Sequence, residues 1–290
     1  MKVAVLGANG QLGSDVCTTF RGNGDEVAAL THADIELTSA ASVEAALTGV
    51  NPEFIVNAAA MHHVEKCEAD PMAAFAANVV GAKHVAEWAK RAGATVAYVS
   101  TDYVFDGKKA SPYVESDAAS PLNAYGITKL AGENYTAAVC PKHFILRVSA
   151  IYGLNPCRAK GGLNFVELML KLSRERDKLR VVDDEIVSPT PTAQIAKQLL
   201  ALSRCNVYGL YHGTSEGSCS WYEFAREIFQ ATGTAVRLEK AEPGEFPAKV
   251  QRPSYSVLEN QGLKRIDQNV FKDWRQGLSD YLEARTAAAV

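Results

Sequence analysis

Short runs of apolar residues alternate along the first half of the chain with stretches in which apolar side chains recur every three or four positions. Such alternation is typical of a parallel sheet with helices on both faces, and strands that are apolar throughout suit a sheet buried on both sides. The apolar runs predict strands at residues 3–6, 26–30, 54–56, 95–100 and 144–148, and the helical period predicts helices at residues 11–20, 41–47, 72–91 and 124–139.

The pattern becomes less regular after about Gly153, where Pro156 and the pair Gly161–Gly162 interrupt it. The predicted fold class is therefore α/β, with a Rossmann-type, doubly wound parallel sheet over residues 1–153. Residues 154–290 are expected to form mainly a smaller C-terminal α/β substrate lobe, with some segments returning to the core. In this half, helices are predicted at residues 165–174, 193–202 and 221–230, and strands at residues 180–182 and 208–212.

Composition and charge exclude several classes of protein. Of the 290 residues, 47% are hydrophobic and 22% are charged, which is ordinary for a globular protein. The net charge of −3 leaves no cationic surplus for a phosphate backbone, so no nucleic-acid partner is expected. No apolar run approaches the ~18 residues of a membrane span, and the apolar start soon breaks into a glycine-rich turn, unlike a signal peptide. We therefore expect a cytoplasmic protein without membrane association.

The first predicted strand runs into a glycine-rich turn. Gly7, Gly10 and Gly13 have the spacing G-x-x-G-x-x-G and stand directly between a strand and a helix. In that context the first glycine permits the tight turn, the second lets the backbone approach a pyrophosphate, and the third lets the helix pack on the sheet. The helix N-terminus then offers N–H groups to the phosphates. The turn therefore favours dinucleotide binding over a merely structural role.

The choice between NAD and NADP depends on the tip of the second strand. An acidic residue there would hold the ribose hydroxyls and repel a 2′-phosphate. The tip residues are Thr31 and His32, and Asp34 lies slightly further along the chain. No arginine stands there to bind a 2′-phosphate. The sequence therefore favours NADP slightly and leaves NAD open.

A tyrosine and a lysine are spaced for catalysis in the predicted helix at residues 124–139. Tyr125 and Lys129 form Y-x-x-x-K, and positions i and i+4 share one face of a helix. A nearby ammonium favours the phenolate and lowers the pKa of a tyrosine from its usual ~10. Tyr125 is therefore predicted to exchange a proton with a carbonyl or alcohol, and Lys129 to hold the nicotinamide ribose.

The strand before that helix ends in Ser100, Thr101 and Asp102, at the sheet edge where ligands bind in parallel α/β folds. Thr101 is predicted to donate a hydrogen bond to the substrate oxygen and to polarise it. Capping a helix or turn is the alternative role of a threonine at such a position. Because Thr101, Tyr125 and Lys129 follow the glycine turn in this order, we favour a catalytic site.

Longer motifs surround these residues. They include residues 57–60, 100–107, 121–126, 129–133, 164–165, 188–190, 209–212, 220–222 and 252–256. Together they resemble the extended short-chain dehydrogenase/reductase family and, within it, the dTDP-4-dehydrorhamnose reductases. The string Thr-Asp-Tyr-Val-Phe-x-Gly at residues 101–107 is the most specific match. The resemblance implies NAD(P)H-dependent reduction of the C4 ketone of a nucleotide-linked deoxysugar, such as dTDP-4-dehydro-L-rhamnose to dTDP-L-rhamnose.

The resemblance also implies roles for individual residues. Thr101, Tyr125 and Lys129 match the family's catalytic trio, and Thr101 and Asp102 are expected to bind substrate. A nucleoside diphosphate needs cationic contacts, and Arg252 is the first candidate, ahead of Arg158 and Lys160. Trp221 and Tyr222 are expected either to contact the base or to line a buried helix face. Cofactor contacts are implied for Gly7, Gly10, Gln11, Leu12, Glu36, Leu37, Ala58, Ala60, Met61, His62, Tyr125 and Lys129.

The chain departs from the family pattern at two places near the sugar. Ala150 replaces an aromatic residue, so the pocket is expected to be wider or differently lined. The pair His62–His63 replaces Thr-Ala, but adjacent side chains rarely converge on one metal and no third ligand is suitably spaced. Asp15 matches an acidic position with which some relatives bind a metal at a dimer contact, so a homodimer stays open. We predict no catalytic metal and, for the six scattered cysteines, reduced thiols.

Two other functions occur on similar scaffolds. The first is that of a sugar-nucleotide dehydratase or epimerase. Dehydratases have the sequence Thr-Asp-Glu where this chain has Thr101, Asp102 and Tyr103. The general acid for water elimination therefore lacks its partner here, which argues against this function. The chain also resembles the regulatory beta subunit of methionine adenosyltransferase, an NADP-binding relative that is not an enzyme. The presence of Thr101, Tyr125 and Lys129 favours a catalytic protein over that alternative.

Overall fold

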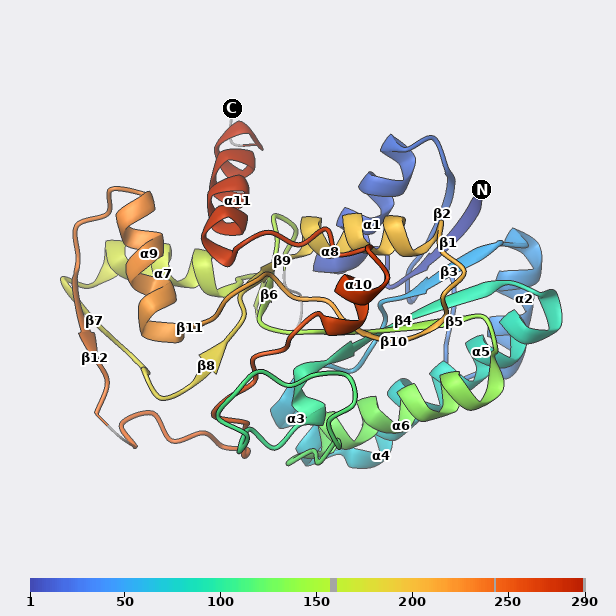
Figure 1. The fold of residues 1–290 in the computed structure, drawn as a ribbon, viewed down its shortest axis with the longest axis horizontal. Coiled ribbons are helices and arrows are strands. Elements are labelled where there is room, and N and C mark those ends of the chain that lie inside the picture. The colour runs from blue at the N-terminus through green and yellow to red at the C-terminus, as the bar shows by residue number, and fades with distance from the viewer. Residues whose placement is uncertain (157–160, 243, 289–290) are drawn as a thin grey trace.

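A six-stranded sheet in which every pairing is parallel forms the centre of the molecule (Figure 1). The computed structural model describes residues 1–156, 161–242 and 244–288. In spatial order the strands are β10 (Gly209–His212), β5 (His143–Val148), β4 (Thr95–Thr101), β3 (Phe54–Asn57), β1 (Lys2–Leu6) and β2 (Glu26–Leu30). The strand order reverses at β1 and β3, where open α/β sheets bind their ligands. The predicted α/β fold class is confirmed.

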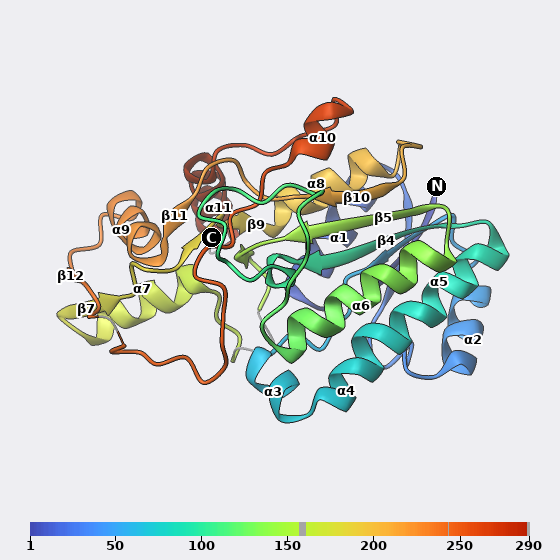
Figure 2. The same ribbon diagram turned by 60° about the horizontal axis from the view of Figure 1, so that its bottom comes forward.

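Helices cover both faces of this sheet, as its uniformly apolar strands require. Buried side chains of α1 (Gln11–Gly22) and α8 (Thr192–Leu202) pack with Val3 and Val5 of β1 on one face. On the other face, α2 (Ala40–Val50), α5 (Gly81–Ala92) and α6 (Ala124–Val139) lie side by side (Figure 2). The sequence predicts α6 with the bounds that the structure has.

The long helix predicted at residues 72–91 is divided. It consists of α4 (Pro71–Phe75), a π-helical turn η1 (Ala76–Val80) and α5, and a short helix α3 (Val64–Ala69) precedes it. Such π turns occur frequently at functional sites. Here the turn places the buried amide of Asn78 so that it donates to the Met61 carbonyl and the Thr128 hydroxyl, each at 3.0 Å. The π turn therefore ties the loop after β3 to α6.

The second half of the chain contributes to two hydrophobic cores. Segment α8, strand β10 and the helix α10 (Gln261–Arg265) pack with the central sheet. A separate core forms around Phe224, Trp274 and the fully buried Tyr152. The elements around it are β6 (Ile151–Tyr152), α7 (Phe165–Glu175), β7 (Lys178–Val181), β8 (Ile186–Val187), β9 (Thr190–Pro191), β11 (Cys219–Ser220), α9 (Trp221–Ala231), β12 (Arg237–Lys240) and α11 (Trp274–Ala288). The sequence pattern did not predict α3, β6, β8, β9, β11, β12, α10 or α11.

Two sequence-level expectations concern the molecule as a whole. In the described ranges, no helix combines the length and the apolar character needed to cross a membrane. The five cysteines of those ranges are free thiols. Cys157 lies outside the described residues.

Two glycines of α1 give a matched test of close packing against the sheet. A Cβ on Gly13 would lie 2.2 Å from the carbonyl oxygen of Gly7, whereas a Cβ on Gly22 would meet nothing within 4 Å. We expect Gly13→Ala to destabilise the fold by ~1–3 kcal/mol, because the helix must move off the turn. Gly22→Ala should stabilise it by ~0.5–1 kcal/mol, because alanine is the better helix former. Thermal unfolding of both variants measures the difference, and equal shifts would contradict it.

Candidate active site

Helix α6 starts beside the end of β4, and this places Tyr125 at the carboxyl edge of the sheet. The Asn123 side chain caps α6 by accepting from the Gly126 N–H at 2.9 Å, and its amide donates to the Gln251 carbonyl. A Cβ on Gly126 would lie 2.2 Å from the Tyr103 carbonyl oxygen, so only glycine allows this approach. The rings of Tyr103 and Tyr125 meet edge to face, 5.8 Å between centroids.

Lys129 lies one turn further along α6 and is almost completely buried, with 2% of its surface exposed. Its ammonium donates to the Val99 carbonyl at 2.7 Å and lies 4.0 Å from the centre of the Tyr98 ring. Burial lowers the pKa of Lys129 to about 7, and the negative charge of Glu133 opposes that shift. The lysine therefore changes its charge near neutral pH.

The electrostatics of Tyr125 differ from the sequence expectation. Burial raises the pKa of Tyr125 above its usual range; the hydrogen bond with Thr101 lowers the pKa, and the charge of Asp102 raises it. The expected lowering by Lys129 is absent among the leading causes, because the ammonium is directed at Val99 and the Tyr98 ring. Tyr125 is therefore a phenol at neutral pH, which is the form that can give up a proton.

Thr101 is the last residue of β4, and Asp102 follows it directly. Thr101 hydrogen-bonds to Tyr125 and also caps the 3-10 turn η2 (Asp102–Val104) by accepting from the Tyr103 N–H at 3.2 Å. Thr101 therefore fills the capping role as well as facing the tyrosine. Its hydroxyl donates to Asp102 Oδ1 at 3.0 Å, and only 4% of the Asp102 surface is exposed.

A buried ion pair holds α6 against β4 and β5 under the site. Arg147 donates to both carboxylate oxygens of Glu133, with Nε–Oε1 at 2.9 Å and Nη2–Oε2 at 2.7 Å. The Ser100 hydroxyl donates to the same carboxylate at 2.5 Å. Both charged residues are at most 4% exposed, so loss of either partner would leave a buried charge unpaired, at a cost of about 3–5 kcal/mol.

The glycine turn has the features of an anion site. Gly7 has φ +77°, and its N–H donates to the Leu30 carbonyl of β2. Helix α1 begins at an N-cap, Gly10, that supplies no side-chain cap, and its first turn carries no acidic residue. The first N–H groups and the helix dipole therefore face the turn without a competing side chain, which suits a pyrophosphate.

Neighbouring residues complete this turn. Leu12 is buried, and the Gln11 amide donates to the carbonyls of Gly153 and Asn155, at 3.4 and 3.3 Å. A Cβ on Gly7 would lie 3.0 Å from the Ala59 backbone, so the turn and the loop after β3 are in close contact.

The residues expected near the two ends of the cofactor lie on three segments. Asp34 accepts from the Thr31 N–H and hydroxyl, at 2.8 and 2.7 Å, so its carboxylate is directed back into its own turn. Glu36 accepts from Thr38 and lies 3.5 Å from His32. The remaining expected contacts are placed by backbone or packing interactions: Leu37 against Gly81, Ala58 bonded to Leu6, Ala60 beside His62, and Met61 bonded to Asn78.

Arg252 comes close to the site from the far end of the sequence. Its Nη2 lies 2.6 Å from Glu65 Oε1, and Glu65 Oε2 is 3.1 Å from His63 Nδ1. The buried Nε of Arg252 has no hydrogen-bond partner among the described residues. Arg158 and Lys160 lie outside the described residues.

The other features considered at the sequence level are also placed. Asp15 accepts from the hydroxyl of Thr192 and, at 3.4 Å, from the amide of Asn155. Within the described ranges, no group of three or more His, Cys, Asp or Glu residues is arranged to hold a metal. Ala150 has φ +45°, a left-handed conformation that is unusual for alanine. Trp221 is partly buried against the second core.

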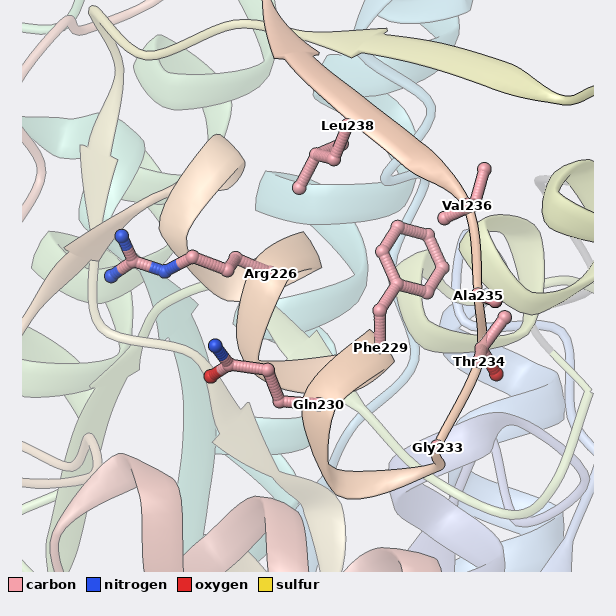
Figure 3. Close-up of a pocket in the computed structure, with 8 residues that line it drawn as sticks. All are labelled: Arg226, Phe229, Gln230, Gly233, Thr234, Ala235, Val236 and Leu238. Atoms are coloured by element: carbon pink, nitrogen blue, oxygen red, sulfur yellow. The ribbon is translucent and has the colours of Figure 1, made fainter.

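Two surface pockets lie in the second half of the chain. One, of about 340 Å³, lies between α9 and β12, with the Phe229 ring directed at Val236 and Leu238 (Figure 3). The other, of about 470 Å³, has an acidic wall that includes Glu185, whose charge acts on Tyr103 beside the tyrosine site. Its lining holds Asp183, Asp184, Glu185 and Glu242 against a single lysine, Lys240, and this excess of acidic side chains does not suit a phosphate.

Several residues of the site were not singled out from the sequence. Ser149 and Ser256 hold the carboxyl group of Asp102, and Glu65 pairs with Arg252. Ser256 stands within residues 252–256, one of the motifs that carry the family resemblance, which was the available signal. Nothing in the local pattern distinguishes Glu65, because its partner is 187 positions away.

Comparison with known proteins agrees with this arrangement. The model of the RmlD substrate binding domain family matches residues 1–287. The spore coat polysaccharide biosynthesis protein SpsK of Bacillus subtilis is 37% identical, and the alignment covers 99% of both chains. The dTDP-4-keto-6-deoxy-D-glucose reductase of Streptomyces niveus is 35% identical over 95% of this chain and 94% of its own.

Solved structures show the same relationship. A dTDP-4-dehydrorhamnose reductase of Clostridium acetobutylicum has a TM-score of 0.93 at 37% identity, over 99% of this chain and 100% of that one. A dTDP-4-dehydrorhamnose reductase of Bacillus anthracis, solved in complex with NADP, has a TM-score of 0.91 at 33% identity, over 98% of this chain and 100% of that one. These matches confirm the resemblance stated from the motifs. The chain belongs to the RmlD substrate binding domain family.

Proposed function

We propose that this protein is a reductase that uses NADPH, or NADH, to convert the C4 ketone of a dTDP-linked deoxysugar into an alcohol. The observation that carries the proposal is the state of Tyr125. Its phenol is kept protonated by burial and hydrogen-bonded to Thr101, at the carboxyl edge of the sheet that also bears the glycine turn. Relatives named for reduction of dTDP-4-keto sugars support the same reaction.

The chain offers a fitting place for a dinucleotide. Gly7, Gly10, Gln11 and Leu12 would hold its pyrophosphate, and Glu36 and Leu37 would lie near its adenine. Ala58, Ala60, Met61, Tyr125 and Lys129 would lie near its nicotinamide half. The Asp34 carboxylate could repel a 2′-phosphate, but it accepts hydrogen bonds from Thr31 and is directed into its own turn. This supports NADP, the cofactor in the Bacillus anthracis relative.

When bound, a reduced dinucleotide would supply the hydride for the carbonyl carbon. Tyr125 would give its phenolic proton to the carbonyl oxygen, so that ketone, hydride and proton together make the alcohol. Lys129 is buried and titrates near neutral pH, and it would hold the nicotinamide ribose. Thr101 keeps the phenol directed within the site through its hydrogen bond.

The substrate is proposed to lie between the sheet edge and the second half of the chain. Arg252, with its unpaired Nε, would bind the diphosphate, while Thr101 would contact the sugar. Residues 154–290, apart from α8, β10 and α10, would form the substrate lobe, and residues 1–153 the NAD(P)-binding domain. Ala150 stands where the family has an aromatic residue that lines the sugar pocket, so the residues specify the sugar less closely than the reaction. A cytoplasmic location and a homodimer stay predictions.

Replacing Tyr125 tests the proposal directly. We expect Tyr125→Phe to lower kcat for a dTDP-4-keto-6-deoxysugar by about 10²–10⁴-fold, because the proton donor is lost. The affinity for NADPH, followed by its fluorescence, should stay within about twofold, since binding does not need the phenolic proton. Tyr135→Phe is a matched control on the same helix, because Tyr135 is 43% exposed.

The contrary outcomes of this experiment are specific. A Tyr125→Phe protein that reduces the keto sugar at the wild-type rate would exclude Tyr125 as the acid. A wild-type protein that binds NADPH but never consumes it, across a panel of keto sugars, would instead favour the non-catalytic regulatory relative.

Replacing Lys129 tests the cost of burying its charge. We expect Lys129→Met to raise the thermal midpoint by a few degrees at neutral pH while lowering activity, because Glu133 keeps its bond to Arg147. The folded-state pKa of about 7 lies below the ordinary value of ~10.4, so the unfolded chain binds more protons in between. The stability gap should therefore be largest below pH 7 and narrow as the pH rises toward ~10.4.

An exposed lysine serves as the comparison for this prediction. Lys83 on α5 makes only a surface pair with Glu87, so Lys83→Met should change the thermal midpoint little at any pH. If Lys129→Met instead destabilised the protein at all pH values, the ammonium would be a net stabilising group and the assignment of its charge state would be wrong.

A further inference from the structure

The backbone on both sides of Arg252 is fastened to the start of α6 and to the loop after η2. The Gln251 carbonyl accepts from the amide of Asn123, the N-cap residue of α6, at 2.9 Å. A Cβ on Gly107 would lie 2.8 Å from Pro253 Cα, so the two backbones are in close contact there. These contacts fix where the Arg252 backbone lies, and they leave the direction of its long side chain to be determined by other groups.

Glu65 determines that direction. It lies in the first turn of α3, and among the residues that the structure describes it is the one acid within ion-pair distance of Arg252, with Nη2 and Oε1 2.6 Å apart. The Nε atom of Arg252 has no hydrogen-bond partner in the same ranges, so the contact with Glu65 is what orients the guanidinium. A free arginine side chain loses rotamer freedom when a ligand orders it, whereas an anchored one is ordered beforehand.

The other oxygen of the Glu65 carboxylate faces His63. Oε2 lies 3.1 Å from His63 Nδ1, and because that nitrogen makes no aligned hydrogen bond with the described residues, proximity and charge link the two groups. Burial acts to raise the pKa of Glu65, but its own backbone N–H and the charges of Arg252 and His63 bring it below its usual range. Glu65 is therefore a carboxylate held between two basic side chains.

We propose that Glu65, steadied by His63, is a positioning residue that holds the Arg252 guanidinium beside the start of α6 for the diphosphate of the substrate. The proposal rests on the reductase function proposed above, including its assignment of Arg252 to the diphosphate. Glu65 acts through Arg252 and needs no contact with the substrate. His63 stands where the family pattern has alanine, so this support for the carboxylate is a feature of this chain.

The negative charge of Glu65 works against an anion, and its effect must be weighed against the benefit of order. A carboxylate near the guanidinium repels a phosphate, but the side chains of His63, Glu65 and Arg252 are 31%, 32% and 34% exposed. Water and salt screen charges at such exposure. The benefit of a guanidinium that is ordered in advance is not screened. Loss of the carboxylate should therefore weaken substrate binding.

Two substitutions of Glu65 separate the acceptor from the charge. Glu65→Ala removes both, and the KM for a dTDP-4-keto-6-deoxysugar should rise about fivefold, which is the effect of leaving one long side chain unordered. Glu65→Gln keeps an oxygen for Arg252 and offers its amide N–H₂ to His63, so it should restore the KM to within about twofold of the wild type. In both variants kcat should change less than about twofold, because the proton donor Tyr125 is not touched.

A double-mutant cycle tests whether Glu65 acts through Arg252. Calorimetry measures the binding of dTDP to the wild type, Glu65→Ala, Arg252→Ala and the double variant. Arg252→Ala should weaken binding about tenfold or more, because a charge-assisted contact with phosphate is lost. Glu65→Ala should weaken it about fivefold in the wild type but less than about 1.5-fold beside Arg252→Ala, where no guanidinium is left to position.

Glu87→Ala is the matched control. Glu87 forms a pair with Lys83 on α5, and both side chains are 39% exposed, close to the exposure of Glu65 and Arg252. Its loss removes a surface carboxylate away from the site, so the KM for the keto sugar and the affinity for dTDP should stay at the wild-type values. His63→Ala should raise the KM about twofold, less than Glu65→Ala, because the carboxylate keeps its contact with Arg252.

Three outcomes would overturn the proposal. A KM that falls in both Glu65 variants would make Glu65 a competitor of the anion for Arg252. Equal weakening of dTDP by Glu65→Ala with and without Arg252 would give Glu65 an effect of its own. A loss confined to kcat would place Glu65 in the chemistry instead. Should the thermal midpoint show that Glu65→Ala folds poorly, His63→Ala takes its place in the cycle, and its weakening of dTDP must vanish beside Arg252→Ala.

Binding of dTDP needs no turnover, so the two proposals fail separately. If the cycle shows that Glu65 acts through Arg252 but no keto sugar is ever reduced, the reductase function is wrong and the role of Glu65 stands. If keto sugars are reduced and Arg252→Ala leaves the dTDP affinity unchanged, the reductase function stands and the role of Glu65 is wrong together with that of Arg252.

Discussion

The bidentate pair between Glu133 and Arg147 is the interaction on which the geometry of the site depends. It joins α6 to β5 in a region closed to solvent, and Ser100 on β4 shares the carboxylate. A planar guanidinium fixes both the distance and the orientation of its partner. With Glu133 fixed, the preceding turn of α6 must place Lys129 against Val99 and Tyr98.

A second constraint is the closeness of backbones around the same helix. Gly126 lies against the Tyr103 carbonyl, and a Cβ on Gly132 would come within 2.3 Å of the Tyr98 hydroxyl. That hydroxyl donates to the carbonyl of Asn78 in the π turn. The small residues on α6 therefore let one helix contact β4 and the π turn at once, and the π turn in turn holds the loop at Met61.

The site buries charged groups that a stability-optimised core would avoid. Lys129 and Asp102 each have less than 5% of their surface exposed. Burial of such groups is unfavourable, and hydrogen bonds to a backbone carbonyl and from a hydroxyl group compensate only part of the cost. Burial sets the protonation states that the chemistry needs: it lowers the pKa of Lys129 to near neutrality and raises that of Tyr125, which stays protonated. The apolar side chains buried in the two hydrophobic cores stabilise the fold and offset the free-energy cost of burying these charged groups.

What the sequence by itself determined is local in character. The strand–helix alternation, the bounds of α6, the glycine turn and the i, i+4 spacing of Tyr125 and Lys129 follow from periodicity and backbone geometry within a few residues. The break of the long helix at Asn78 was missed, because a π turn leaves no clear mark on an apolar pattern.

Only the tertiary structure decided the environment of each functional group. Ser149 reaches Asp102 across 47 positions and Arg252 reaches Glu65 across 187, and no local pattern encodes such pairs. The sign of the Tyr125 pKa shift was reversed for the same reason: spacing places an ammonium on the right helix face, but that ammonium is directed at Val99, and burial of the phenol raises its pKa.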